Sequence, residues 1–470
     1  MSMFWKLVIF SSAIFFFSWF FAYKTGINSL IVQSEDTLPA MFLPLSIIKE
    51  ETFYLDTYYN TMLRKYPHPD DKTFEKQLTP FYLRRIVAGN GLVHYVSAFP
   101  IMAGILALPV YVLPVLFGVS ATFANLTVLA HTSSALIVAF AGSFLYLVLK
   151  KRFSLDEKQS LLLMAVYMFG TVNYAMVSQA LWQHGAVQLF SILGLYFLLG
   201  SFAKSIFKHK VLFLFLASLM LGFAVISRPT AIITVVLMSF LVVERFGLKA
   251  KGFIALLIYI FGLIPAALFF LWYNSAFYVT ISNQGYTSQL LVNWLGAFPE
   301  GFFGLWFSPS KGAFVYSPIL LFSLVGLYLS IAKGAWRRNF KYIVFGNIVI
   351  LHALFMGSWK HWFGGWSFGY RMLSDVLPFL ILLMIPYIKS DIFAKTKAWF
   401  FGLFVISLLV QLFGILFFDG IWHAAYDKGY RDTSWLWSVR DSEFMFTVRR
   451  ALVKFGVLEK ACETCLPGKV

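Results

Sequence analysis

Two adjacent carboxylates, Glu35 and Asp36, follow the first apolar segment of the chain, residues 5–23. A carboxylate near the end of a membrane span can meet both lipid headgroups and water, and it can act as a general base on a hydroxyl within hydrogen-bond reach. The alternative is a solvated loop or a helix cap, with Asp36 starting an interfacial helix over residues 38–50. Two acids also offer hard oxygen ligands, so a divalent metal, Mg²⁺ or Mn²⁺, stays open as a cofactor held by Glu35 and Asp36.

The densest polar and aromatic segment runs from Ser358 to Arg371 and contains three Trp and three Gly. Glycine allows a backbone to approach a ligand closely. Arg371, at the start of an apolar segment, can offer a bidentate fork to a phosphate, with Lys360 and His361 as neighbouring cations. The alternative is an interfacial aromatic belt with a snorkelling arginine.

Three further loops hold polar candidates. Arg228 lies between two apolar segments, where a charge is unfavourable unless it is paired or hydrated. We therefore treat Arg228 as a candidate functional residue. Trp182 and His184 lie in another turn, although a lone histidine is more often structural. Lys311, in segment 304–318, is another candidate for a phosphate contact.

The composition indicates an integral membrane protein. Of 470 residues, 60% are hydrophobic and 13% are charged, and 54 Phe, 23 Tyr and 14 Trp suit bilayer cores and interfacial belts. The net charge of +17 is better explained by positively charged cytoplasmic loops than by nucleic acid, which we exclude as a partner. Residues 5–23 have no clear small-residue cleavage site, so we expect a retained anchor rather than a signal peptide.

The apolar segments predict an all-α polytopic protein with about 11 transmembrane helices. The expected spans are 5–23, 125–149, 159–181, 186–203, 211–227, 229–243, 253–273, 313–332, 342–357, 372–388 and 398–418.

The apolar stretch 92–118 decides the orientation of every later loop. If it does not cross the membrane fully, Lys and Arg gather in the short loops on the side of the N-terminus, which the positive-inside rule makes cytoplasmic. Its three prolines favour a broken, re-entrant or interfacial helical pair within a first outer loop, 25–124. The transmembrane domain is then 1–418, with a short outer tail, 419–470, and all the candidate loops share the side of Asp36.

Other signatures are absent from the sequence. It contains no Walker motif, no His-Glu-x-x-His and no internal repeat of the inverted transporter kind. Cys462 and Cys465 are the only cysteines; two thiols rarely form a structural zinc site, so a local disulfide or no bond is expected.

Taken in order, the loop motifs resemble the GT-C superfamily of membrane glycosyltransferases, in particular bacterial members related to protein mannosyltransferases and lipid A aminoarabinose transferases. The segments with this resemblance are Glu35-Asp36-Thr37-x-Pro39 with Leu43-Pro44-Leu45-Ser46, Trp182-Gln183-His184-Gly185, Ser227-Arg228-Pro229-Thr230, the run from Ser308 to Pro318, and the run from Gly364 to Arg371.

The resemblance implies an inverting transferase on the outer face of the bacterial inner membrane. It would move a sugar from a polyprenyl-phosphate donor to a hydroxyl of a glycan, a glycolipid or a protein. The acidic catalytic residue of the first outer loop in that superfamily corresponds to Asp36, with Glu35 as its neighbour. Many relatives end in a sizeable outer domain, whereas the tail expected here is short, which puts acceptor recognition by such a domain in doubt.

For this reaction we expect the cations to stabilise the leaving phosphate and the aromatic loops to contact the sugar. The phosphate candidates are Arg371, Arg228, Lys360, His361 and Lys311, and the sugar candidates are Trp366, Trp182 and His184.

Two other classes stay open. A transporter or flippase of lipid-linked sugars would use the same outer cavity but would need ionisable residues within its spans. The spans offer few polar candidates: Asn125, His131, His352 and Asp375. A structural or assembly subunit would not need Arg228 between two apolar spans.

Overall fold

The chain forms two compact units. The computed structural model describes residues 1–28, 34–203, 207–278, 296–332 and 339–459, so Cys462 and Cys465 lie outside the described residues. Unit 1 comprises Met1–Ser12, Ser34–Phe153 and Ala180–Val292, and unit 2 comprises Ala13–Gln33, Ser154–Gln179 and Asn293–Val470. The first helix, α1 (Met3–Lys24), begins in unit 1 and ends in unit 2.

The protein is an integral membrane protein of polytopic helical architecture. Within the described ranges, nine helices are long and apolar enough to cross a bilayer, or ten if a pair bent by 49° at Gly170 counts as one span. This number is lower than the expected eleven because two of the apolar segments are broken. Segment 159–181 bends after Phe169, and segment 313–332 contains three short helical pieces in place of one long helix.

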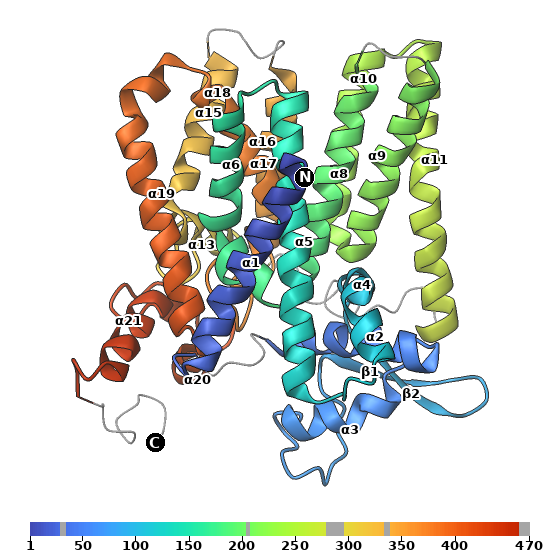
Figure 1. Cartoon of the computed structure of the whole chain (residues 1–470), viewed down its shortest axis with the longest axis vertical. Helices are drawn as coiled ribbons and strands as arrows, with labels where there is room; N and C mark the ends of the chain where they lie inside the picture. The colour runs from blue at the N-terminus through green and yellow to red at the C-terminus, as the bar shows by residue number, and fades with distance from the viewer. Residues whose placement is uncertain (29–33, 204–206, 279–295, 333–338, 460–470) are drawn as a thin grey trace. The chain divides into compact units, whose positions relative to one another are not determined.

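Unit 1 combines long apolar helices with a group of shorter elements from the first loop. Figure 1 shows α2, α3, the hairpin and α4 gathered at one end of α5. In chain order the elements of unit 1 after α1 are η1 (Glu35–Thr37), α2 (Leu38–Glu50), α3 (Asp56–Lys65), β1 (Leu83–Val87), β2 (Val93–Ser97), α4 (Met102–Leu116), α5 (Phe123–Arg152), α8 (Gln183–Ser201), α9 (Phe207–Ser227), η3 (Pro229–Ala231), α10 (Ile232–Phe246), α11 (Ala250–Tyr273) and η4 (Asn274–Tyr278).

The hairpin β1–β2 is a small addition to an otherwise helical architecture, which agrees with the all-α expectation. The two strands pair antiparallel, from Leu83 opposite Ser97 to Val87 opposite Val93. The sequence contained a signal for it, because Asn90-Gly91 is a turn dipeptide between two runs rich in β-branched and aromatic residues. Asp56 at the start of α3 anchors the hairpin: its carboxylate accepts a hydrogen bond from the Tyr95 N–H and lies 2.6 Å from His94 Nδ1. Asp56 therefore has a structural role in holding the hairpin against α3.

The expected helix over residues 38–50 is present as α2, whereas segment 92–118 differs from its prediction. Residues 93–97 form strand β2 in place of a helix, and only residues 102–116, which form α4, are helical. At 15 residues α4 is shorter than a membrane span. A Cβ at Gly104 of α4 would lie 3.0 Å from Leu43 of α2, so the two helices approach closely there.

Unit 2 contains the remaining helices, and its final elements lie at the C-terminal end of α19 (Figure 1). In chain order they are α6 (Glu157–Phe169), α7 (Val172–Ala175), η2 (Val177–Gln179), α13 (Glu300–Phe307), α14 (Ala313–Tyr316), η5 (Pro318–Leu320), α15 (Leu321–Ile331), α16 (Phe340–Gly357), η7 (Arg371–Val376), α17 (Leu377–Leu383), α18 (Ile385–Ile388), α19 (Asp391–Phe417), α20 (Ile421–Tyr426), η8 (Ser434–Leu436) and α21 (Glu443–Lys454).

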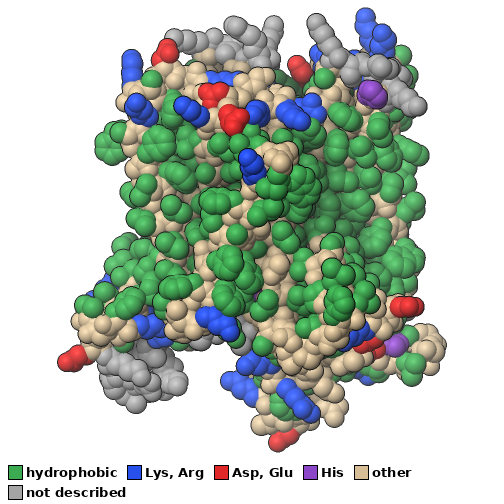
Figure 2. Space-filling view, viewed as in Figure 1, with side chains coloured by type: hydrophobic (Ala, Val, Ile, Leu, Met, Phe, Trp, Pro, Cys, Tyr) green, Lys and Arg blue, Asp and Glu red, His purple; other side chains and the backbone are tan. Residues whose placement is uncertain are grey.

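Large hydrophobic side chains cover the outward faces of the long helices. Phe253, Phe261 and Leu268 of α11 are exposed, as are Val405 and Leu409 of α19. Figure 2 shows hydrophobic side chains along the helices of each unit, with Lys and Arg near the helix ends. Exposed apolar faces of this extent suit contact with lipid rather than with water.

We predict that Gly304→Ala destabilises unit 2. A Cβ at Gly304 of α13 would lie 2.2 Å from the buried ring of Trp362, so α13 would have to move away from that ring, at a cost of about 1–3 kcal/mol. Thermal unfolding in detergent should show a lower midpoint. Gly402→Ala in α19 is the matched control, because nothing lies within 4 Å of a Cβ there. An equal loss in both variants would contradict the explanation.

Candidate functional site

The carboxylate pair is positioned by a capped turn at the start of α2. Glu35 and Asp36 belong to the 3₁₀ turn η1, and Ser34 is its N-cap: the Ser34 hydroxyl accepts from the Asp36 N–H at 3.4 Å. The Thr37 hydroxyl donates to the Ser34 carbonyl at 2.9 Å. The N-cap of α2 itself is Thr37. Ser34 and Thr37 occupy the N-cap positions of η1 and α2, so Asp36 lies within the turn that leads into α2, and its role as a base stays a prediction.

Glu35 has an environment that suits proton transfer. Both carboxylates are half-buried. Burial, and then the negative charge of Asp36, raise the pKa of Glu35 to about 7. Two tyrosines belong to the same environment, the half-buried Tyr66 and the buried Tyr82. Burial, followed by the charge of Glu35, raises the pKa of Tyr66 to about 12 and also raises the pKa of Tyr82. Near neutral pH the carboxylate pair can therefore gain or lose a proton.

Helix α4 links this turn to the ends of α8 and α9 within unit 1. It packs against α2 on one side and against α8 and α9 on the other. Met102 of α4 shares a buried cluster with Ala186 near the start of α8 and with Ile226 near the end of α9. These two helix ends hold His184 and Arg228.

Arg228 and His184 form a buried pair. Arg228 Nη1 lies 2.9 Å from His184 Nδ1. A guanidinium can only donate, so Nδ1 is the acceptor and the neutral imidazole has its proton on Nε2. Arg228 and the Nε2–H of His184 thus provide cationic and neutral hydrogen-bond donors in one place. Trp182 is buried beside them at 3% exposure, with its ring centroid 6.1 Å from that of His184.

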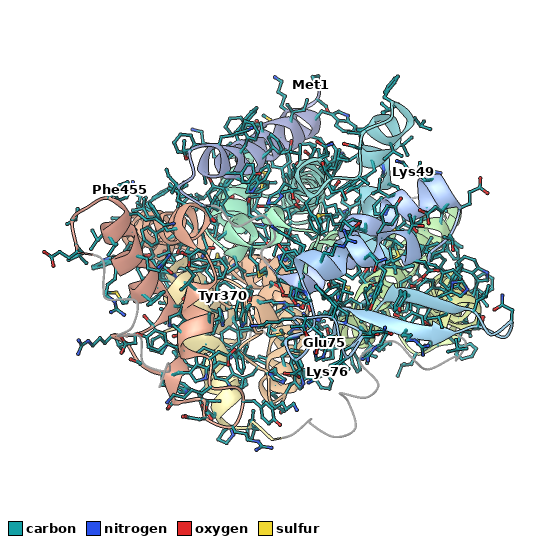
Figure 3. All side chains as sticks on the ribbon, turned by 90° about the horizontal axis from the view of Figure 1, so that it is seen from below. Met1, Lys49, Glu75, Lys76, Tyr370 and Phe455 are labelled. Atoms are coloured by element: carbon teal, nitrogen blue, oxygen red, sulfur yellow. The ribbon has the colours of Figure 1, made fainter. Side chains whose placement is uncertain are left out.

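In unit 2, the segment 358–371, here termed the Gly-Trp loop, has a backbone that requires glycine. Gly364, Gly365 and Gly369 have φ of 80°, 64° and 67°, a region that other residues rarely adopt. Arg371 is half-buried at the end of the loop, and its Nη1 donates to the Gly364 carbonyl at 3.1 Å. Tyr370, labelled in Figure 3, donates its buried hydroxyl to Ser317 Oγ at 2.8 Å.

Lys360 and His361 of the Gly-Trp loop pack against the tail. The Lys360 ammonium lies 4.0 Å from the centre of the Tyr430 ring, and the His361 ring lies 5.2 Å from it. Burial, and then the charge of Lys360, lower the pKa of His361. His361 is therefore neutral at pH 7 and acts by hydrogen bonding rather than by charge.

The two sugar-stacking candidates have different surroundings. Trp366 is 49% exposed, and its ring stacks on His423 at 5.8 Å between centroids with an interplanar angle of 21°. One face of Trp366 thus packs on protein while much of the side chain stays accessible. Because Trp182 is buried, Trp366 is the better stacking platform of the two.

Lys311 is buried in an ion cluster that sequence reasoning did not predict. Its Nζ lies 2.7 Å from Glu443 Oε1, and both side chains are at most 1% exposed. His423 Nε2 lies 3.1 Å from the same carboxylate oxygen. Lys311 could contact a phosphate only after exchanging this partner. Neither Glu443 nor His423 had a sequence signal, because both lie in the tail, far along the chain from Lys311.

The polar candidates within the spans make internal contacts. His131 Nδ1 lies 2.9 Å from the Thr127 carbonyl one turn earlier in its own helix. His352 Nε2 lies 2.9 Å from the Met372 carbonyl and 3.9 Å from Asp375. Within the described ranges, no group of three or more His, Cys, Asp or Glu side chains could hold a metal ion. A metal on Glu35 and Asp36 stays a prediction.

The predicted residues therefore fall into two groups. Unit 1 brings together Glu35 with Asp36, and Arg228 with His184 and Trp182. Unit 2 brings the basic and aromatic residues of the Gly-Trp loop together with the tail. No family model matches the sequence, and neither does any curated protein. The resemblance to GT-C glycosyltransferases stays a prediction from the motifs.

We predict that Asp36→Asn lowers the pKa of Glu35 from about 7. The substitution removes the like charge that opposes ionisation of Glu35, while burial still keeps its pKa above the usual value. Infrared or ¹³C NMR titration of the side-chain carboxyl would measure the shift, with Glu35→Gln identifying the signal. An unchanged pKa would show that the two carboxylates do not interact.

Proposed function

We propose that this protein is an inverting glycosyltransferase of the GT-C kind, using a polyprenyl-phosphate sugar at the outer face of a bacterial inner membrane. The observation that supports the proposal best is the capped turn holding Glu35 and Asp36 half-buried, with the pKa of Glu35 raised to about 7. A carboxylate pair that exchanges a proton near neutral pH suits general-base catalysis on a hydroxyl.

In the proposed step, an acceptor hydroxyl oxygen attacks the anomeric carbon of the donor sugar. The bond from that carbon to the phosphate oxygen breaks, and its electron pair leaves with the polyprenyl phosphate. The hydroxyl proton moves to Asp36, the proposed base, and the neighbouring Glu35 shares it. Attack from the side opposite the leaving group inverts the anomeric centre.

Negative charge develops on the leaving phosphate, so nearby cations would favour the reaction. Arg228 and the Nε2–H of His184, in the same unit as the carboxylates, are suitable donors for this role. A phosphate contact by Arg371 and Lys360 and stacking of the sugar on Trp366 stay predictions from the sequence. A divalent metal bound to the carboxylates would add charge stabilisation, and every step above uses only groups of the chain.

We expect Asp36→Asn to lower sugar transfer about 10²–10⁴-fold, the usual contribution of a general base. The assay is transfer from a panel of radiolabelled polyprenyl-phosphate sugars in proteoliposomes. Glu51→Gln, at the exposed end of α2, is the matched control and should retain activity. Translocation of the donor without consumption, equal in wild type and Asp36→Asn, would contradict the proposal and favour a flippase.

The pH dependence gives a second test. Below pH about 7 Glu35 holds a proton, so the carboxylate pair takes up the acceptor's proton less readily. Above pH about 7 Glu35 has lost that proton. Transfer should therefore rise as the pH increases through about 7 and then level off. The measurement is the pH profile of kcat/KM, and an activity that falls over this range would contradict a base with this ionisation.

A further inference from the structure

The tail of unit 2 is attached to the Gly-Trp loop by one fully buried carboxylate. Glu443, the first residue of α21, is 0% exposed. Its Oε1 contacts Lys311 at 2.7 Å and His423 at 3.1 Å, and its Oε2 accepts from the Tyr316 hydroxyl and the Gly369 N–H, both at 2.9 Å. Four groups thus surround one carboxylate.

Two of these contacts fix the backbone of the loop. The Gly369 N–H donates directly to Glu443, and Lys311, held by Glu443, donates to the Ser367 carbonyl. The two residues lie on either side of Phe368, between Trp366 and Arg371. The tail therefore fixes the loop backbone between Trp366, which we propose stacks on the sugar, and Arg371, which we propose binds the phosphate.

Burying these charges is unfavourable unless they are well paired. Burial opposes ionisation of Glu443, but Lys311, His423 and the Gly369 N–H outweigh it and keep its pKa low. Burial, and then the charge of Lys311, lower the pKa of His423 to about 4, so this imidazole is neutral. An apolar contact could attach the tail to the loop without this desolvation penalty. An ionic contact adds direction, because it orients one N–H and one carbonyl of the loop.

We propose that Glu443 is a positioning residue for donor binding: it holds the Gly-Trp loop so that Trp366 and Arg371 can engage a polyprenyl-phosphate sugar together. This inference rests on the proposed function, since it assumes that the loop binds the donor. Glu443 itself does not contact the donor in this proposal. The tail supports the binding site through Glu443.

The test uses the full-length protein and two variants of Glu443. Glu443→Asp keeps the charge beside Lys311 but is one methylene shorter, so it should fold and lose its hold on Gly369. Glu443→Gln removes the charge and leaves Lys311 buried without a carboxylate, so it should be the less stable of the two. Glu300→Asp is the matched control, because Glu300 accepts hydrogen bonds from Thr433 and Trp437 of the same tail and so anchors it outside the Gly-Trp loop.

Two readouts are compared: hydrogen exchange of the peptide containing Gly369, and binding of a polyprenyl-phosphate sugar followed by tryptophan fluorescence. Glu443→Asp should speed exchange in this peptide and weaken binding about tenfold, the size of one lost charge-assisted hydrogen bond. Glu300→Asp should do neither.

Unchanged exchange in Glu443→Asp, or faster exchange with unchanged binding, would overturn the positioning role. Neither readout requires turnover. A protein that binds the donor without transferring sugar would therefore overturn the proposed function and leave this inference intact, whereas a wild type that does not bind the donor would overturn both.

Discussion

The absence of water inside a bilayer is the constraint on which the rest of this structure depends. Every backbone N–H and C=O within the hydrocarbon layer must find a partner in the protein, so the spans are helices. Their sides are covered by apolar residues, as on α11 and α19. The sequence therefore concentrates its candidate chemistry where the spans end, in the turn before α2, at the junction of α9 and η3, and in the loop before η7.

Loops at these positions must be ordered by other means than regular secondary structure, and the chain uses short polar contacts. In unit 1, Ser34 caps the turn that holds Glu35 and Asp36, and Asp56 anchors the hairpin through Tyr95 and His94. In unit 2, Glu443 binds Lys311 and the Gly369 N–H. The contacts differ in burial: the turn is half-buried and open to proton exchange, whereas the Glu443 cluster is fully enclosed.

The neighbouring groups, rather than the degree of burial, give these two glutamates different properties. Burial, and then the negative charge of Asp36, raise the pKa of Glu35 to about 7. Glu443 lies beside a lysine and a histidine, so it stays ionised. A glutamate that exchanges protons suits chemistry, and a glutamate with fixed charge suits positioning. The surrounding side chains, more than the residue type, separate the two roles.

The sequence by itself determined the membrane class, the approximate positions of most helices and the loops in which polar residues collect. These features follow from composition, span length and charge, which are local quantities. It also placed α2 at residues 38–50, because proline and the preceding polar residues mark a helix start. The hairpin was missed although Asn90-Gly91 indicated it, since the apolar run after Gly91 favoured a helix.

Only the tertiary structure decided the partners. The pairs Arg228–His184 and Lys311–Glu443 join residues 44 and 132 positions apart, and no periodicity or spacing in the chain predicts such contacts. The sequence also does not predict that Trp182 is buried while Trp366 is partly exposed, because both residues occur in similar aromatic loops. Partner and burial depend on how distant segments pack, and they decide the ionisation of Glu35, the tautomer of His184 and the fixed backbone around Gly369.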